Sequence, residues 1–102
     1  MNENNDKLVM LHLRPTYHKI GEYTFKIILD KHTFKNSNDI NISLSDPENN
    51  EVDIGVEKWG RKITCKFEIS KDMSDGVCVL KISTDKNSTT KLNKTFSFWV
   101  IK

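Results

Sequence analysis

The stretch SDGVCVLKIS, residues 74–83, decides the fold class because its apolar residues recur with a period of two. In an extended chain, Cys78, Leu80 and Ile82 point to one side, and Val77 and Val79 point to the other. The polar start, Ser-Asp-Gly, is typical of a turn. The stretch therefore predicts a half-buried β-strand that follows a turn.

The same alternation recurs along the chain in short runs separated by turn residues. The further predicted strands cover residues 8–13, 22–29, 40–44, 52–56, 62–69 and 96–101. No run has the 3.6-residue apolar period of a helix, and the chain contains neither alanine nor glutamine, which favour helices. This pattern predicts an all-β fold, an Ig-like β-sandwich of about seven antiparallel strands. A five-stranded OB-type barrel is the alternative, although it needs longer strands.

The length of 102 residues predicts one domain. Residues 1–7 form a polar N-terminal arm in this interpretation, and residues 8–102 form the single Ig-like domain. The apolar run 8–13 is too short for a signal peptide or a membrane span. We therefore expect no membrane insertion and cytoplasmic synthesis without a signal peptide, with assembly into a virion as one outcome. An extracellular location follows instead if the sequence was trimmed from a longer chain.

Charge and composition argue against nucleic acid as a partner. Lys and Arg total 16, Asp and Glu total 14, and the formal net charge is +2, which indicates a mixed surface. The only arginines are Arg14 and Arg61, whereas base and phosphate recognition usually relies on arginine. Lysine and asparagine are abundant, and their AT-rich codons suggest a bacterial, phage or viral genome.

The two cysteines, Cys65 and Cys78, both fall on inward positions of predicted strands. Without a signal peptide, reduced thiols are the default, so we expect both to be apolar core residues. A disulfide between them and a reactive thiol are the alternatives. The disulfide would require the two Cα atoms to lie within about 7 Å of each other.

The sequence contains no metal-ligand spacing, nucleophile motif or phosphate-binding glycine loop, so we expect no catalysis, cofactor or metal. The spacing of the three histidines, His12, His18 and His32, is not one of a metal-binding motif. The densest acidic group comprises Asp46, Glu48, Glu51 and Asp53. This group is typical of a solvated turn, and a weak calcium site is its alternative.

Four residues are candidates for partner binding. Trp59 is followed by Gly60 and Arg61 among charged neighbours, so it either covers one end of the sandwich or anchors a partner. Trp99 alternates with Phe98 in the last predicted strand, so one of the two rings faces outward. Together with Tyr17, the two tryptophans and Arg61 form the candidate set.

Three segments resemble bacterial and phage Ig-like domains of the macroglobulin-like or bacterial Ig-like type. They are RPTYHKIGEYTFKI (14–27), ISLSDPENNEVDI (42–54), and FEISKDMSDGVCVLKIS (67–83) followed by FSFWVIK (96–102). The resemblance implies a sandwich and covers nearly the whole chain after residue 8. It departs from the family at Cys78, where many such domains carry a tyrosine that bonds a corner. We expect Ser74 and Asp75 to hold this corner through a side-chain-capped turn.

These observations predict a non-catalytic structural or protein-interaction module, most concretely a small phage virion component such as a capsid decoration or a tail accessory. Its expected partner is a protein or another copy of the chain. A carbohydrate-binding or adhesion module of a secreted or surface protein is the first alternative, which exposed coplanar aromatic rings would favour. A small inhibitor or regulator of a host protein is the second.

Overall fold

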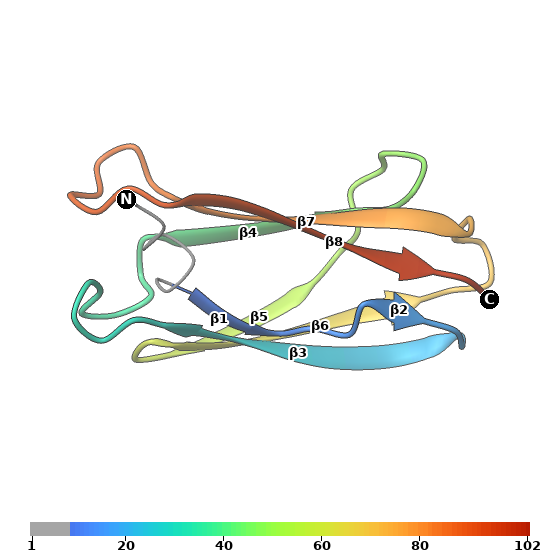
Figure 1. Cartoon of the computed structure of the whole chain (residues 1–102), viewed down its shortest axis with the longest axis horizontal. Helices are drawn as coiled ribbons and strands as arrows, with labels where there is room; N and C mark the ends of the chain where they lie inside the picture. The colour runs from blue at the N-terminus through green and yellow to red at the C-terminus, as the bar shows by residue number, and fades with distance from the viewer. Residues whose placement is uncertain (1–8) are drawn as a thin grey trace.

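The computed structural model of the chain describes residues 9–102, and the strands in this range form two four-stranded sheets (Figure 1). Sheet 1 contains, in spatial order, β1 (Val9–His12), β3 (Gly21–Leu29), β6 (Lys62–Ile69) and β5 (Gly55–Trp59). Sheet 2 contains β2 (Thr16–Tyr17), β8 (Asn93–Val100), β7 (Gly76–Thr84) and β4 (Ile40–Ser45). No helix occurs among these residues, so the prediction of an all-β, sandwich-like fold is confirmed.

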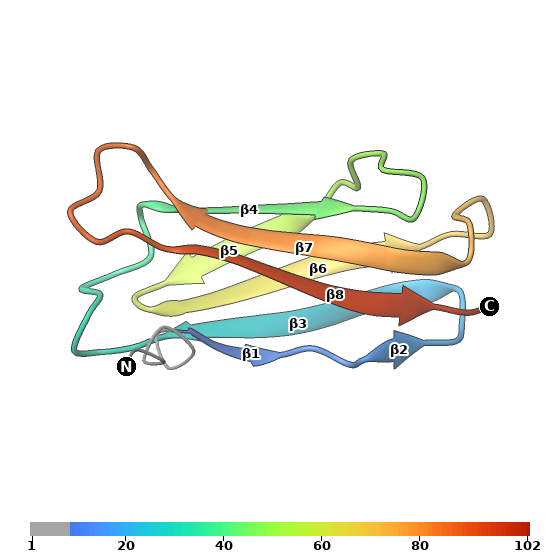
Figure 2. The same ribbon diagram turned by 45° about the horizontal axis from the view of Figure 1, so that its top comes forward.

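The two sheets lie one above the other, and the strands run nearly along the long axis of the molecule (Figures 1 and 2). The inward residues of both sheets form one core. The most completely buried large side chains are Phe25, Ile27, Leu29, Ile40, Leu44, Ile63, Ile69, Leu80, Ile82, Phe98 and Val100. Almost all of them occupy alternate positions of the long strands, which is the period-two pattern read from the sequence.

The first strand differs from the prediction because the chain changes sheets at Arg14 and Pro15. The short strand β2 then runs parallel to β8, with Thr16 opposite Trp99, whereas the other strand pairs are antiparallel. Pro15 has no N–H to donate, but its carbonyl oxygen accepts a 2.9 Å hydrogen bond from the Trp99 N–H. The structure therefore contains an eighth strand and one parallel pair. Residues 1–7 of the predicted arm lie outside the described residues.

The predicted strand 52–56 is wrong in its position, because β5 begins only at Gly55. Val52 and Ile54 lie where the chain crosses from sheet 2 to sheet 1, and both pack against the core. The Val52 N–H donates a 2.8 Å hydrogen bond to the Leu44 carbonyl oxygen, so this segment covers the edge of β4. The alternation at 52–56 thus reflects packing of a crossing segment, and the strand follows it.

Both cysteines are free and buried, as the core interpretation predicted. Cys65 lies on β6 in sheet 1, and Cys78 lies on β7 in sheet 2. Burial raises the pKa of each thiol to about 11, and the nearby Asp46 carboxylate adds to the effect at Cys78. At neutral pH both thiols are therefore protonated apolar groups, which is how a packing residue behaves.

Four aromatic rings fill the end of the core that lacks a tyrosine at position 78. The ring centroid of Tyr17 lies 4.7 Å from that of Tyr23, 5.5 Å from that of Phe67 and 5.2 Å from that of Phe98. All three contacts are edge-to-face, which is a favoured geometry for aromatic pairs. Tyrosines on β2 and β3 therefore supply the aromatic packing at this end.

The loop before β7 is held by contacts with other segments and not by caps of its own turn. The Ser74 hydroxyl donates a 2.7 Å hydrogen bond to the Glu48 carboxylate. Asp75 accepts a 3.2 Å hydrogen bond from the Lys102 N–H and lies 3.5 Å from the Lys102 ammonium group. The predicted residues are involved, but they fasten the loop to the 46–50 turn and to the chain end.

Candidate interaction surface

Trp99 lies on the outer surface of sheet 2, where Val77 is its apolar neighbour. On β8, Phe98 and Val100 point into the core, so Trp99 points outward and is 51% exposed. The strand register places Trp99 beside Thr16 on β2 and beside Val77 on β7. The prediction that one of the two neighbouring rings faces outward is confirmed, and the outward ring is the tryptophan.

We call the outward positions of sheet 2 the Trp99 face. Its members are Thr16, Asn41, Ser43, Ser45, Val77, Val79, Lys81, Ser83, Asn93, Thr95, Ser97 and Trp99. The Ile101 backbone, two residues beyond Trp99, lies beside β2, because its N–H donates a 2.9 Å hydrogen bond to the Tyr17 carbonyl oxygen. Ile101 is also exposed. Among the described residues, Lys81 is the one charged member of this face, and the remaining members are hydroxyl, amide or apolar residues.

The outward positions of sheet 1, the Trp59 face, have a different composition. They are Met10, His12, Glu22, Thr24, Lys26, Ile28, Gly55, Glu57, Trp59, Lys62, Thr64, Lys66 and Glu68. Among these residues are three glutamates, Glu22, Glu57 and Glu68, and three lysines, Lys26, Lys62 and Lys66. A partner that covered it would have to remove several charges from water, which costs free energy unless each charge is paired.

Trp59 is exposed and does not cover the end of the sandwich, because 85% of its surface is accessible. It ends β5, and a two-residue turn of Gly60 and Arg61 leads to Lys62 at the start of β6. Gly60 has a φ of 63°, which glycine adopts without strain and which suits a tight hairpin. The Arg61 carbonyl oxygen accepts a 3.0 Å hydrogen bond from the Leu29 N–H.

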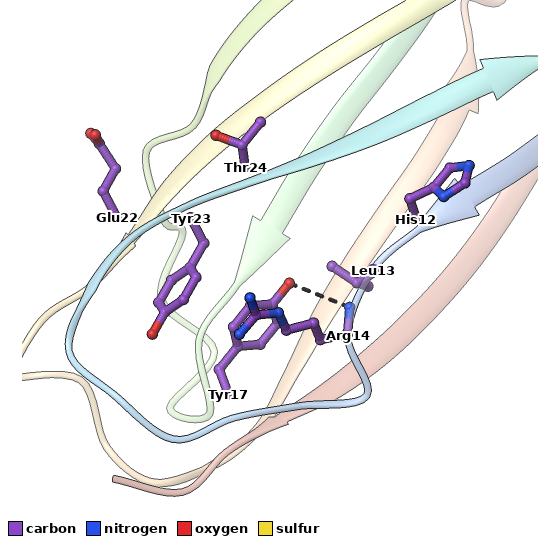
Figure 3. Close-up of a pocket in the computed structure, with 7 residues that line it drawn as sticks. All are labelled: His12, Leu13, Arg14, Tyr17, Glu22, Tyr23 and Thr24. Carbon is purple, nitrogen blue, oxygen red and sulfur yellow. Dashed lines mark hydrogen bonds between the residues drawn. The ribbon is translucent and has the colours of Figure 1, made fainter.

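Tyr17 is the buried member of the candidate set, since only 3% of its surface is accessible. Its ring lies beneath Arg14, whose guanidinium carbon is 5.6 Å from the ring centroids of both Tyr17 and Tyr23 (Figure 3). The Tyr17 hydroxyl oxygen accepts a 3.4 Å hydrogen bond from the Arg14 N–H. Burial raises the pKa of Tyr17. The pocket lined by Arg14, Tyr17 and Tyr23 is therefore a cluster of aromatic rings covered by a guanidinium group, and Tyr17 has a packing role.

The four sequence candidates do not form one site. Trp59 and Arg61 lie on the hairpin of sheet 1, Trp99 lies on sheet 2, and Tyr17 lies in the core. Sequence reasoning did not identify Val77 as a surface neighbour of Trp99. The pairing of β7 with β8 brings Val77 there, and that register becomes visible only in the folded sheet.

The titratable residues are dispersed. Within residues 9–102, no three His, Cys, Asp or Glu side chains come together in a way that could hold a metal ion. In the acidic turn, the Asp46 carboxylate accepts hydrogen bonds of 2.9 and 2.8 Å from the N–H groups of Glu48 and Asn50. The Nδ1 atom of His18 donates a 3.1 Å hydrogen bond to the Ile101 carbonyl oxygen. These groups therefore stabilise turns and the chain end.

The described part of the chain contains no helix that is long and apolar enough to cross a bilayer. No protein-family model matches the sequence, and no curated protein matches it. The resemblance to Ig-like families consequently stays a prediction.

Proposed function

We propose that this chain is a non-catalytic, Ig-like protein-interaction module that binds a protein through the Trp99 face. The observation that carries the proposal is the exposed row of Trp99 and Val77 on a sheet surface with a single charged residue. Trp is enriched among the residues that dominate binding energy at interfaces. Covering this face removes apolar surface from water and desolvates few charges, so both contributions favour a protein contact.

The strand order supports the Ig-like part of the proposal. In Ig sandwiches of the constant type, the first, second, fifth and fourth strands form one sheet, and the third, sixth and seventh form the other. If β1 and β2 are counted as two halves of a first strand, the strands β3 to β8 become the second to the seventh. Sheet 1, in the order β1-β3-β6-β5, then contains the first, second, fifth and fourth strands. Sheet 2, in the order β8-β7-β4, contains the seventh, sixth and third. The two orders correspond strand by strand.

The most concrete form of the proposal is a small phage virion component, such as a capsid decoration or a tail accessory. The lysine- and asparagine-rich composition supports this form. An inhibitor or regulator of a host protein would use the same face. Carbohydrate binding is less well supported, because Trp59 and Trp99 lie on different sheets and Tyr17 is buried. A sugar chain would therefore meet one tryptophan at a time and not a shared aromatic platform.

A pair of photo-crosslinking variants tests the proposal. A photoreactive amino acid replaces Ser97, in the middle of the Trp99 face, or Thr64, in the middle of the Trp59 face. We expect the probe at position 97 to form one defined protein adduct in an extract of the source cells, and we expect Trp99→Glu to abolish that adduct. Adducts of equal yield from both positions, or none from position 97, would contradict the proposal.

A further inference from the structure

We propose that β8 has a free edge from Asn93 to Ser97, and that the partner protein pairs an extended segment with this edge as an additional strand of sheet 2. This inference rests on the proposed function, because it states how the partner of the Trp99 face is held. Three features support it: the direction of the backbone groups of β8, the incomplete cover of the core beside them, and a groove between β8 and β1.

β8 is paired along its whole length on one side but only at its C-terminal end on the other. β7 pairs with β8 from Asn93 to Val100, whereas β2 pairs with it at Trp99 and Val100. The Trp99 N–H donates a 2.9 Å hydrogen bond to the Pro15 carbonyl oxygen, so the backbone groups of Trp99 point toward β2. Because these groups alternate in direction along a strand, those of every second residue before Trp99 point to the same side.

The residues whose backbone groups face this side are Asn93, Thr95 and Ser97, and all three are exposed. Within residues 9–102, no strand pairs with them there. The ladder between β2 and β8 stops at Pro15, because proline has no N–H to donate to β8. Each of the three residues therefore offers an N–H and a carbonyl oxygen at strand spacing, and the partner that matches such a row is an extended main chain.

The core is incompletely covered beside the same edge. The Tyr17 ring of β2 packs on Phe98, with the ring centroids 5.2 Å apart, and Phe98 is 1% exposed. β2 does not reach Phe96, the previous inward residue of β8, and Phe96 is only half-buried. Leu11 and Leu13 also pack against the core and are half-buried. An apolar side chain placed among these three residues would remove apolar surface from water.

An open groove of about 390 Å³ provides the space for such a strand between β8 and β1 (Figure 2). It is lined by Val9, Leu11, Leu13, Arg14, Pro15, Phe96 and Ser97. β1 belongs to sheet 1 and stacked sheets are about 10 Å apart, whereas a strand that pairs with β8 must lie at about 4.8 Å. The edge from Asn93 to Ser97 is about 13 Å long, which accommodates about five residues of the partner.

The geometry also specifies the chemistry of the partner segment. Its inward side chains enter the groove and should be apolar, whereas its outward side chains extend the Trp99 face and should be polar. Residues 1–8 of this chain, MNENNDKL, lack this alternation and contain three asparagines, which are depleted in strands. We therefore assign the strand to a partner and not to the start of this chain.

Hydrogen exchange of the full chain, followed by NMR, tests whether the edge is free. We expect the amides of Thr95 and Ser97 to exchange at least about a hundredfold faster than those of Phe96 and Phe98, which point toward β7. Equal protection of the two sets would show that the edge is already paired and would overturn the proposal.

A synthetic peptide tests the pairing itself. The probe is a capped peptide of alternating valine and threonine with a lysine at each end, and we expect it to bind with a Kd below about 1 mM and to slow exchange at Thr95 and Ser97. Two further peptides carry backbone N-methyl groups on either the valines or the threonines. Only one of these sets has its N–H groups facing β8, so only one methylated peptide should lose binding. Absence of binding by the unmodified peptide, or equal effects of the two methylations, would contradict strand pairing.

A variant of β8 separates this inference from the proposed function. Thr95→Pro removes the central N–H of the edge but no hydrogen bond to β7, so the fold should persist and peptide binding should weaken about tenfold or more. Thr95→Val is the matched control and should bind the peptide normally. Thermal unfolding checks the fold of both variants, and the methylated peptides test the unchanged protein. If Trp99→Glu abolishes the position-97 adduct in extracts but Thr95→Pro leaves it intact, strand pairing is refuted and the proposed function stands.

Discussion

The outer surfaces of the two sheets differ far more than the inner ones. Inside, both sheets contribute alternating Ile, Leu, Phe and Cys side chains to a single core. Outside, the Trp59 face carries glutamates and lysines, whereas the Trp99 face carries serines, threonines and valines around one tryptophan. Because the inward positions determine the fold, the outward positions of the two sheets can differ in composition. Covering the Trp59 face would remove more charges from water than covering the Trp99 face.

The largest expected effect separates the inside of sheet 2 from its outside. Phe98 is 1% exposed and its neighbour Trp99 is 51% exposed. Phe98→Ala should lower the free energy of unfolding by about 3–5 kcal/mol, because it leaves a cavity in the core. Trp99→Ala should lower it by less than about 1 kcal/mol. Urea denaturation measures both values, and similar losses would show that Trp99 stabilises the fold.

The pH dependence of the free energy of unfolding tests whether the buried thiols of the two sheets behave alike. Cys65 and Cys78 each have a pKa of about 11 in the folded protein, raised from 9.0. Below pH 9 both states hold the thiol proton, so the stabilising contribution is complete. Between pH 9 and 11 the unfolded chain ionises first, so the free energy of unfolding should fall.

Lysines also titrate in this range, so the control is a variant in which both cysteines are replaced by valine. The difference between the two proteins isolates the thiols. A fall in the free energy of unfolding that is equally steep in the variant would contradict the assignment.

The smallest expected effect on stability concerns a lysine on the edge strand β5 and not on either face. The Lys58 ammonium group donates a 2.7 Å hydrogen bond from β5 to the Ile40 carbonyl oxygen on β4, across the open side between the sheets. Lysines on edge strands hinder pairing with other chains. Lys58→Met should cost about 0.5–1.5 kcal/mol of stability and should promote association through β5. Trp99→Glu should not reverse that association, and light scattering on the double variant checks this.

The sequence predicted the inward half of the molecule well, since period-two alternation follows directly from burial on one side of a strand. It did not predict β2, because a two-residue strand has no alternation to detect. It also placed a strand at Val52 and Ile54, since residues of a crossing segment can pack on the core as strand residues do.

The candidate surface could be predicted only in part. The outward direction of Trp99 follows from its alternation with Phe98. The neighbourhood of Val77 does not, because these two residues are 22 positions apart and meet only through the register of β7 and β8. Tyr17 could not be assigned to the core from its sequence context, since the change of sheets at Pro15 is what turns its ring inward.

The change of sheets at Pro15 also has a mechanical consequence. Because β2 and β8 run in the same direction, a force that pulls the two ends of the chain apart slides these strands along each other. The hydrogen bonds from Trp99 to Pro15 and from Ile101 to Tyr17 then share the load and must break together. A pair that is peeled open from one end would lose its bonds one after another. The short parallel strand therefore equips this domain to resist tension along its length.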